Sequence, residues 1–390
     1  MGHVSFIPLS RRGFLQGLGG IAALSLLGLP FGPIAQASAA GGRTFLAATG
    51  RTLLAVDLAA GKAQSVPLQF IPHSFVPHPH EPGRVWAIER GHDEAAYAAG
   101  PAAAGPGRVS AAEIDIGSGE VLQYLAPPEG SHFFGHGFFA PDGSTLFISR
   151  VDMGTGDGLL TGYDAAGKII ADHAVAKGAV HEICLMADGT AMAVSSGIKP
   201  VPGSGNRFSG PRVDKGALLY IGLASGKVIE KQPVEDDAQM IGHCHRMEDG
   251  TLFVLARPRA QAKKGTPGKV FKGHVGAGPL REVSYTGSAG AGATGECLSI
   301  AVDERSKRAL ITNPENKRIL VMDTHEGAFA GELDIYSRGV VFDPSVRRFY
   351  AGMTDLFEID AATLAIQPWE PGLADGLGNR SLDSSHSLLL

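Results

Sequence analysis

The sequence has few cysteines and few charged residues, and each shortage excludes a class of protein. Only 3 of its 390 residues are cysteine, and 19% are charged. Without any Cys-x-x-Cys or Cys-x-x-Cys-His, the chain is neither a disulfide-rich scaffold nor a carrier of haem attached in the usual c-type manner. Because 44% of its residues are hydrophobic, it is not a disordered chain either.

Common catalytic motifs are also missing. The chain has no Gly-x-Ser-x-Gly, no glycine-rich phosphate loop ending in Lys-Ser or Lys-Thr, and no His-Glu-x-x-His. Its formal net charge of -5 gives no indication of a nucleic-acid partner. After the first forty residues, no segment approaches the roughly 18 consecutive apolar residues of a membrane helix, so we predict no membrane span once that segment is removed.

Those first forty residues have the pattern of an export signal. They contain the twin-arginine phrase SRRGFL (10–15), an apolar stretch over 18–29 and the small-residue cleavage site AQA (35–37). This order is typical of bacterial proteins that are exported in a folded state. We therefore predict a twin-arginine signal peptide over 1–40, a single mature domain over 41–390 and a periplasmic location.

The mature chain is rich in turns, with 54 Gly and 24 Pro in the full sequence. One recurrent signal is an apolar strand that runs, mostly through Asp, into a short turn. Copies of it begin at Val56-Asp57, Ile114-Asp115, Tyr163-Asp164, Ile221-Gly222, Met322-Asp323 and Ile359-Asp360, and all but the last contain glycine in the turn. A second signal, an acidic turn such as Pro141-Asp142-Gly143, precedes the first in each unit.

Together the two signals divide the chain into seven units. Their bounds are 44–70, 71–130, 131–178, 179–237, 238–288, 289–337 and 338–372. Units of about 40 to 60 residues with three or four short strands predict an all-β, seven-bladed β-propeller; a β-solenoid usually repeats at shorter intervals. The first unit shows only three strands, and residues 384–390 resemble the missing one. We therefore predict that the C-terminal strand joins blade one and closes the ring.

A short histidine-bearing phrase opens several units. When the units are aligned on their acidic turns, His73, His136, His181, His243 and His386 occupy nearly equivalent positions. In a closed ring, the innermost strands surround a central channel. We therefore expect these five imidazoles to converge at one end of that channel.

Other chemically active side chains accompany the histidines. Those at or beside the aligned positions are Glu182, Cys244, Glu296, Cys297 and Arg338. Because imidazole, thiolate and carboxylate are suitable ligands for iron, copper and zinc, we predict a metal site formed by the five histidines, the two glutamates and the two cysteines. Arg338 is a candidate anion-binding residue.

An architectural interpretation competes with this metal site. In WD-type propellers, a Gly-His pair before the inner strand bonds to neighbouring turns, and Gly135-His136 and Gly242-His243 are such pairs. The tryptophan that usually accompanies them is absent here. Structural histidines, and a site for a small anion beside Arg338, remain alternatives.

Three phrases resemble a known family: HSFVPHP (73–79), FGHGFFAPDG (134–143) and VHE (180–182). With the leader, they resemble uncharacterised, twin-arginine-exported seven-bladed propellers encoded beside imelysin-type and di-haem cytochrome-like proteins of periplasmic iron uptake. A fainter similarity extends to the amine-dehydrogenase and YVTN-like propellers. The phrases carry over His73, His136 and His181-Glu182, whereas blade five departs from the family pattern with His243-Cys244-His245.

The resemblance implies a role in iron uptake or metal handling, with the imelysin-like and cytochrome-like proteins as partners. From the ligand chemistry, we expect iron or copper as the bound metal. A second hypothesis is an oxidoreductase or electron-transfer subunit of the amine-dehydrogenase type. A third is a protein-interaction scaffold with structural histidines. Whether the chain is an enzyme stays open at this point.

Overall fold

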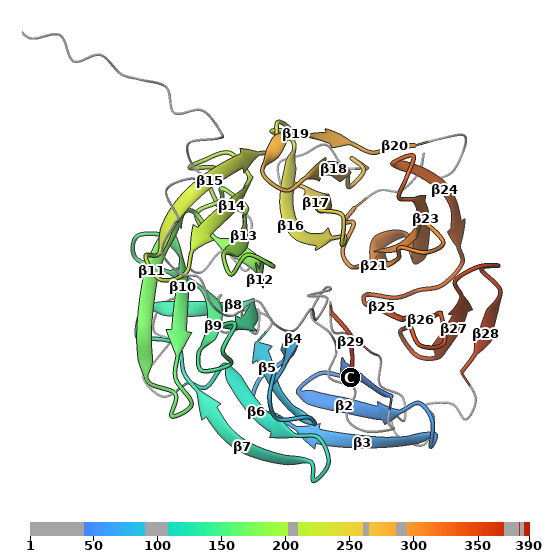
Figure 1. The fold of residues 1–390 in the computed structure, drawn as a ribbon, viewed down its shortest axis with the longest axis horizontal. Coiled ribbons are helices and arrows are strands. Elements are labelled where there is room, and N and C mark those ends of the chain that lie inside the picture. Colours follow the sequence, from blue (N-terminus) through green and yellow to red (C-terminus); the bar gives the residue numbers. More distant parts are fainter. Residues whose placement is uncertain are drawn as a thin grey trace, which may run out of the picture.

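The computed structural model describes residues 43–89, 108–201, 210–259, 265–285, 295–369, 382 and 386–390. Within this part of the chain, 29 β-strands form seven sheets that are arranged as a ring (Figure 1). This confirms the predicted all-β, seven-bladed propeller. The predicted signal peptide over 1–40 lies outside the described residues. Among the described residues, no helix has the length and apolar character needed to cross a membrane.

Each sheet is one blade, and its first strand is the one nearest the channel. Blades one to four are β29 (Leu388–Leu389), β1 (Thr44–Ala48), β2 (Thr52–Asp57) and β3 (Lys62–Pro67); β4 (Pro72–Pro77), β5 (Arg84–Glu89), β6 (Ala111–Asp115) and β7 (Glu120–Leu125); β8 (Ser131–Phe139), β9 (Leu146–Asp152), β10 (Asp157–Tyr163) and β11 (Ile169–Lys177); and β12 (Val180–Leu185), β13 (Ala191–Ser195), β14 (Ala217–Gly222) and β15 (Lys227–Pro233). All strand pairs within these blades are antiparallel.

Blades five to seven follow the same plan. They are β16 (Gln239–Arg246), β17 (Thr251–Pro258), β18 (Val270–His274) and β19 (Ala277–Glu282); β21 (Ile300–Asp303), β22 (Arg308–Asn313), β23 (Arg318–Asp323) and β24 (Ala328–Leu333), with the 3-10 turn η2 (Pro314–Asn316); and β25 (Val340–Asp343), β26 (Arg348–Gly352), β27 (Leu356–Asp360) and β28 (Ile366–Pro368). One segment differs from the sequence-based division. β20 (Ser284–Tyr285), placed in the fifth unit, pairs in parallel with β24 of blade six.

Burial decreases from the middle of each blade to its rim. The middle strand β14 reads ALLYIG and is buried at every position but its last, whereas the outermost strand β15 reads KVIEKQP and is exposed at its first five. A middle strand has neighbouring blades against both faces, so it is apolar throughout and does not alternate. The core is therefore a series of apolar layers between successive blades, such as the one that joins Met192 and Tyr220 of blade four to Val254 and Phe271 of blade five.

The recurrent turns obey the chemistry expected from their sequences. In the first, the Asp57 carboxylate accepts hydrogen bonds from the N–H groups of Ala59 and Ala60, both at 2.9 Å, and Gly61 takes a positive φ of 66°. The last copy lacks glycine, yet Leu364 adopts the same conformation with φ 62°. A left-handed leucine is strained relative to glycine, so the Asp and its backbone bonds are sufficient to set the turn.

The C-terminus closes the ring as predicted. Strand β29 pairs with β1, with Leu388 opposite Leu46 and Leu389 opposite Phe45. Leu389 packs in the apolar layer shared with blade seven, and Leu390 packs in the layer shared with blade two. The last residues thus pack toward blade seven on one side and blade two on the other, and they cover the edge of β1.

We expect Leu389→Ala to lower the free energy of unfolding by about 2–4 kcal/mol, because it leaves a cavity in the layer that closes the ring. Leu389 is 3% exposed, whereas Ile366, on the outermost strand of blade seven, is 41% exposed. Ile366→Ala is therefore the matched control, with an expected change within about 0.5 kcal/mol. Urea unfolding followed by fluorescence measures both. Equal losses in the two variants would contradict closure by the C-terminal strand.

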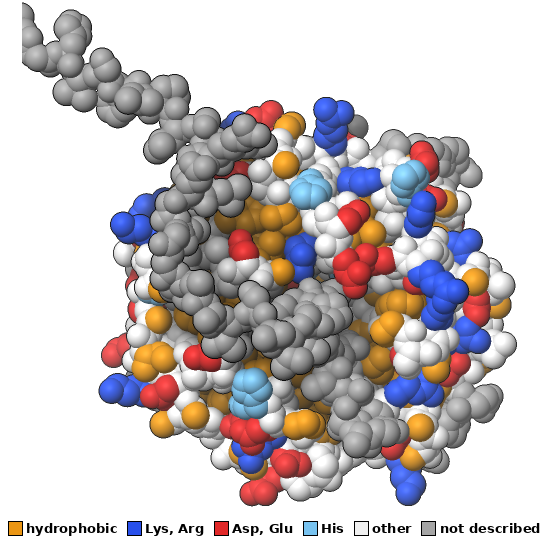
Figure 2. Space-filling model, in the orientation of Figure 1, with side chains coloured by type: hydrophobic (Ala, Val, Ile, Leu, Met, Phe, Trp, Pro, Cys, Tyr) orange, Lys and Arg blue, Asp and Glu red, His pale blue; other side chains and the backbone are white. Residues whose placement is uncertain are grey.

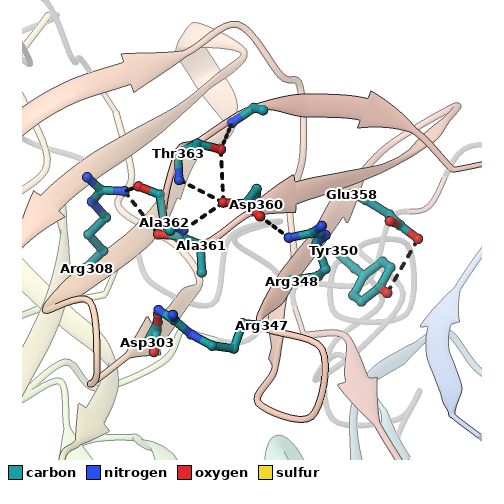
Figure 3. A network of polar contacts seen from close by, with 11 residues as sticks. Asp303, Arg308, Arg347, Arg348, Tyr350, Glu358, Asp360, Ala361, Ala362 and Thr363 are labelled. Atoms are coloured by element: carbon teal, nitrogen blue, oxygen red, sulfur yellow. Dashed lines mark hydrogen bonds and ion pairs between the residues drawn. The ribbon is translucent and has the colours of Figure 1, made fainter.

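Charged side chains join blade six to blade seven near the turn that follows β27 (Figure 3). The Arg347 guanidinium pairs with Asp303 of blade six. Arg308 of blade six donates to the carbonyl oxygen of Ala361 at 3.0 Å. In these contacts an arginine bonds either to a backbone carbonyl or to a carboxylate that neutralises its charge. We therefore interpret the network as architectural. On the face drawn in Figure 2, charges of both signs are interspersed among the described residues.

Candidate metal centre

Four innermost strands each bring one histidine to the channel. His73 lies in β4, His136 in β8, His181 in β12 and His243 in β16, which belong to blades two, three, four and five. All four are nearly fully buried, with exposed fractions of 1%, 6%, 3% and 3%. The successive order of the blades explains how residues far apart in sequence share one location.

A β-bulge stands at each of these histidines. His73 is itself the extra residue of β4, and His243 directly follows the extra Gly242 in β16. His136 and His181 lie inside the irregular segments of β8 and β12. A bulge bends its strand and redirects the side chain, and bulges are frequent next to functional sites. Here they coincide with the point at which each imidazole is directed to its neighbours.

The four imidazoles form a compact group that could hold a metal ion. One ring nitrogen from each lies within 4.8 Å of all the others. Points this close fit within about 2.9 Å of a common centre, so shifts of about 1 Å or less would bring each nitrogen to the 2.0–2.1 Å of a zinc–imidazole bond. Nε2 of His73 and Nε2 of His136 are 3.1 Å apart, close to the separation of two ligands on one tetrahedral ion.

Hydrogen bonds select the nitrogens that face the centre. Nδ1 of His181 lies 2.8 Å from the carbonyl oxygen of Phe134. A carbonyl only accepts, so Nδ1 carries the proton and Nε2 keeps its lone pair for a metal. In His243, Nδ1 faces Nε2 of His386 at 3.0 Å and a Glu182 oxygen at 3.5 Å, which leaves Nε2 as its metal-facing nitrogen.

His386 adds a fifth imidazole from the C-terminal segment. Its ring centroid lies 4.4 Å from that of His243, 4.7 Å from that of His136 and 5.1 Å from that of His73. Burial, together with the neighbouring His243, lowers the pKa of His386 to about 3. His386 is therefore neutral at ordinary pH, and it stands beside the four-histidine group as a partner of His243.

Glu182 is a carboxylate in contact with this group. One of its oxygens accepts the N–H of Cys244 at 2.6 Å and lies 3.5 Å from Nδ1 of His243. Burial raises the pKa of Glu182 to about 7, although His386 and the Cys244 N–H act in the opposite direction. A carboxylate that contacts the outer nitrogen of a ligand histidine orients the ring and increases its basicity.

The other candidate residues lie apart from the four-histidine group. Glu296 pairs with Arg257 at 3.7 Å. Cys297 packs in the apolar layer between blades five and six, where burial raises the pKa of its thiol to about 12. The Cys244 side chain packs in the layer between blades four and five. Arg338 is close enough to His386 for its charge to lower the pKa of that imidazole, so a cation does stand near the cluster.

The glycine of one Gly-His pair makes room for the preceding blade's histidine. A Cβ on Gly135 would lie 2.5 Å from the His73 ring, whereas one on Gly242 would lie 3.4 Å from the His181 ring, which is an ordinary contact. Gly135 also has a positive φ of 100°. The Gly135-His136 pair therefore supplies an imidazole of its own and a gap for His73, a relation that the sequence pattern alone does not reveal.

The fold and the buried imidazoles together define a seven-bladed β-propeller with a four-histidine group that could hold a metal ion. The chain belongs to the family described as "Protein of unknown function (DUF1513)", whose model matches residues 84–345. No curated protein matches the sequence significantly.

Solved propellers share the fold at low sequence identity. The hydrazine synthase of Kuenenia stuttgartiensis has a TM-score of 0.54 and 13% identity, covering 82% of this chain and 89% of that chain. The β-propeller domain of Cps50 (Swd1) from Myceliophteria thermophila has a TM-score of 0.51 and 11% identity, with coverages of 78% and 88%. U3-55K has a TM-score of 0.51 and 10% identity, with coverages of 77% and 81%. At these identities the similarity concerns the fold alone.

Proposed function

We propose that this protein binds one transition-metal ion at the four-histidine group and serves periplasmic metal handling, with iron uptake as the process. The observation that carries the proposal is the convergence of four buried imidazole nitrogens, one from each of four consecutive blades, within 4.8 Å of one another. Placing polar rings together in an apolar interior is costly unless they bond to one another or to a shared ligand.

The imidazole donors restrict which metal ions the site suits. Neutral imidazoles suit iron, copper, zinc and nickel, whereas magnesium and calcium prefer oxygen ligands. The four neutral imidazoles supply no charge of their own, and Glu182 places a carboxyl group 3.5 Å from His243. Among divalent ions, Cu²⁺ should bind most tightly because it heads the general affinity order, and Fe²⁺ should bind more weakly. We therefore propose copper from the affinity order, and iron from the resemblance to propellers of iron uptake.

The cellular setting of the proposal depends on the sequence. The twin-arginine phrase supports export in a folded state, which suits a protein that acquires metal before it leaves the cytoplasm. The resemblance to propellers encoded with imelysin-like and di-haem cytochrome-like proteins supports these as partners. An electron-transfer role would use the same metal, with a cytochrome as the docking protein.

A second candidate function, an interaction scaffold, is favoured by one specific observation. His73 and His136 are within hydrogen-bonding distance at 3.1 Å, and His243 and His386 are at 3.0 Å. Imidazoles in alternating donor and acceptor roles satisfy one another without a metal. In that case the rings would fix the spacing of the blades and the functional surface would lie elsewhere.

A metal titration separates the two functions. The chelator-treated protein should bind one equivalent of Cu²⁺ per chain by calorimetry and, under anaerobic conditions, one of Fe²⁺ more weakly. Saturation at 100 times the dissociation constant should stabilise the fold by about 2.7 kcal/mol, measured as a shift in the thermal midpoint. Absence of binding tighter than micromolar for both ions, in a protein with an intact β-sheet spectrum, would leave the scaffold as the better interpretation.

A further inference from the structure

Two of the three cysteines face each other across a blade boundary. Cys184 lies in β12 of blade four and Cys244 in β16 of blade five, and both strands are the innermost of their sheets. The two side chains pack against the same apolar layer, which contains Met186, Met192 and Val254. The thiols of Cys184 and Cys244 are in hydrogen-bonding contact with each other.

The backbone around the two thiols is tied together independently of them. The side chains of Glu182 and Cys184 are both directed from β12 toward blade five, since Cys184 packs in the layer between blades four and five and Glu182 contacts Cys244. The Glu182 carboxylate accepts the N–H of Cys244 at 2.6 Å. The face of β12 that bears Cys184 is therefore held directly against the position of Cys244, and the thiol contact is part of a fixed blade-to-blade junction.

We propose that Cys184 and Cys244 form a reversible disulfide that joins the innermost strands of blades four and five beside the histidine cluster. The inference is separate from metal binding, because it concerns a covalent bond between two side chains that lie outside the four-histidine group. It assigns a redox modification site to the junction at which β12, carrying His181, meets β16, carrying His243.

The oxidant in this proposal is a disulfide, either small or carried by a protein. One cysteine thiolate attacks the oxidant's disulfide, forms a mixed disulfide and releases one thiol. The second cysteine then attacks the mixed disulfide, closes the Cys184–Cys244 bond and releases the second thiol. Two electrons and two protons pass from the cysteine pair to the oxidant, whose single disulfide becomes two thiols.

The surroundings of the three thiols make the reaction selective. Cys184 and Cys244 are partly exposed as residues, although their side chains pack against an apolar layer, whereas Cys297 is 1% exposed in a different layer. Because the thiolate is the reactive form and an ordinary cysteine thiol has a pKa of about 8.5, exchange should be slow at neutral pH and faster in mildly alkaline buffer.

The test counts thiols in the full chain after treatment with oxidised glutathione at mildly alkaline pH. Protein that is then unfolded and alkylated should carry one label, against three for the dithiothreitol-reduced protein, since the sequence has 3 cysteines. Trypsin should release a cross-linked pair of peptides, 178–207 and 232–246. Dithiothreitol should restore all three labels and remove the cross-link.

Two variants give matched controls. Cys297→Ala should keep the cross-link and lose the remaining label, whereas Cys184→Ala should abolish the cross-link. The proposal is overturned if the treated wild-type protein keeps three labels while its circular dichroism shows a folded β protein, or if glutathione adducts form on Cys184 and Cys244 without a bond between them. Neither readout involves metal, so a failure of the proposed metal site leaves this result unaffected.

Discussion

His181→Ala should weaken metal binding by about 100- to 1,000-fold, because it removes one of four imidazoles from a site whose full ligand set contributes on the order of 10–16 kcal/mol. His181 is the ligand whose protonation state is best defined, since its Nδ1 donates to the Phe134 carbonyl oxygen at 2.8 Å. The ring is therefore held with Nε2 toward the other histidines. Competition with a chromophoric chelator measures the affinity of each variant.

The matched control for this prediction is His325→Ala. The His325 side chain is 66% exposed and lies next to Glu326 on a surface turn. This substitution removes the same chemical group without changing the histidine cluster, so the metal affinity should stay within about twofold of the wild type. Equal affinities for His181→Ala and the wild-type protein would show that any bound metal resides elsewhere.

The metal-free protein should lose stability steeply as the pH falls from 6.5 to 4.5. Burial lowers the pKa of His386 to about 3 and that of His132 and His245 to about 4, each from 6.5. Between about pH 4 and pH 6.5, these histidines bind protons in the unfolded chain but stay neutral in the folded chain. The stability from the three neutral histidines is thus complete above pH 6.5 and is lost on acidification.

Glu182 has the opposite effect, since it stabilises the folded protein as the pH falls over the same range. Its pKa is raised from 4.5 to about 7 in the folded protein, so its contribution is complete below pH 4.5 and is lost as the pH rises toward 7. In this pH range the three histidines bind about three more protons in the unfolded chain, whereas Glu182 binds about one more in the folded chain. The unfolded chain therefore binds about two more protons in total. At about 1.4 kcal/mol per proton and pH unit, acidification by two units should remove about 5 kcal/mol.

Urea unfolding at a series of pH values, in the presence of a chelator, measures this slope. His132→Gln should reduce it by about one proton, or about 1.4 kcal/mol per pH unit, because glutamine does not titrate. His325→Gln, at an exposed position, should leave the slope unchanged. A free energy of unfolding that is constant between pH 6.5 and 4.5 would contradict the burial of neutral histidines as a determinant of stability.

The architecture could be predicted from the sequence because the turns carry local chemistry. In five blades, the hairpin between a middle and an outer strand has an Asp that caps its own turn, as Asp57 does. Counting these turns together with the acidic turns that precede them yields seven units, and the incomplete first unit predicts the closing strand. The parallel pairing of Ser284–Tyr285 with β24 could not be predicted, since a two-residue strand has no pattern and its partner lies in another blade.

The candidate site could be predicted only as a set of equivalent positions. The sequence indicates which blades carry a histidine, but the bulges that direct the rings depend on strand register, which no single strand reveals. The partner of His181 is a main-chain carbonyl, that of Phe134, so no side-chain pattern could identify it. Likewise, the role of Gly135 follows from its distance to His73 in the preceding blade.

The pairing of β29 with β1 couples the closure of the ring to the fifth imidazole of the cluster. Leu388–Leu389 pair with β1, and His386, two residues earlier, lies against His243 of blade five. Separation of β29 from β1 would therefore open the ring and withdraw His386 from His243 at the same time. The integrity of the ring and the composition of the histidine cluster change together.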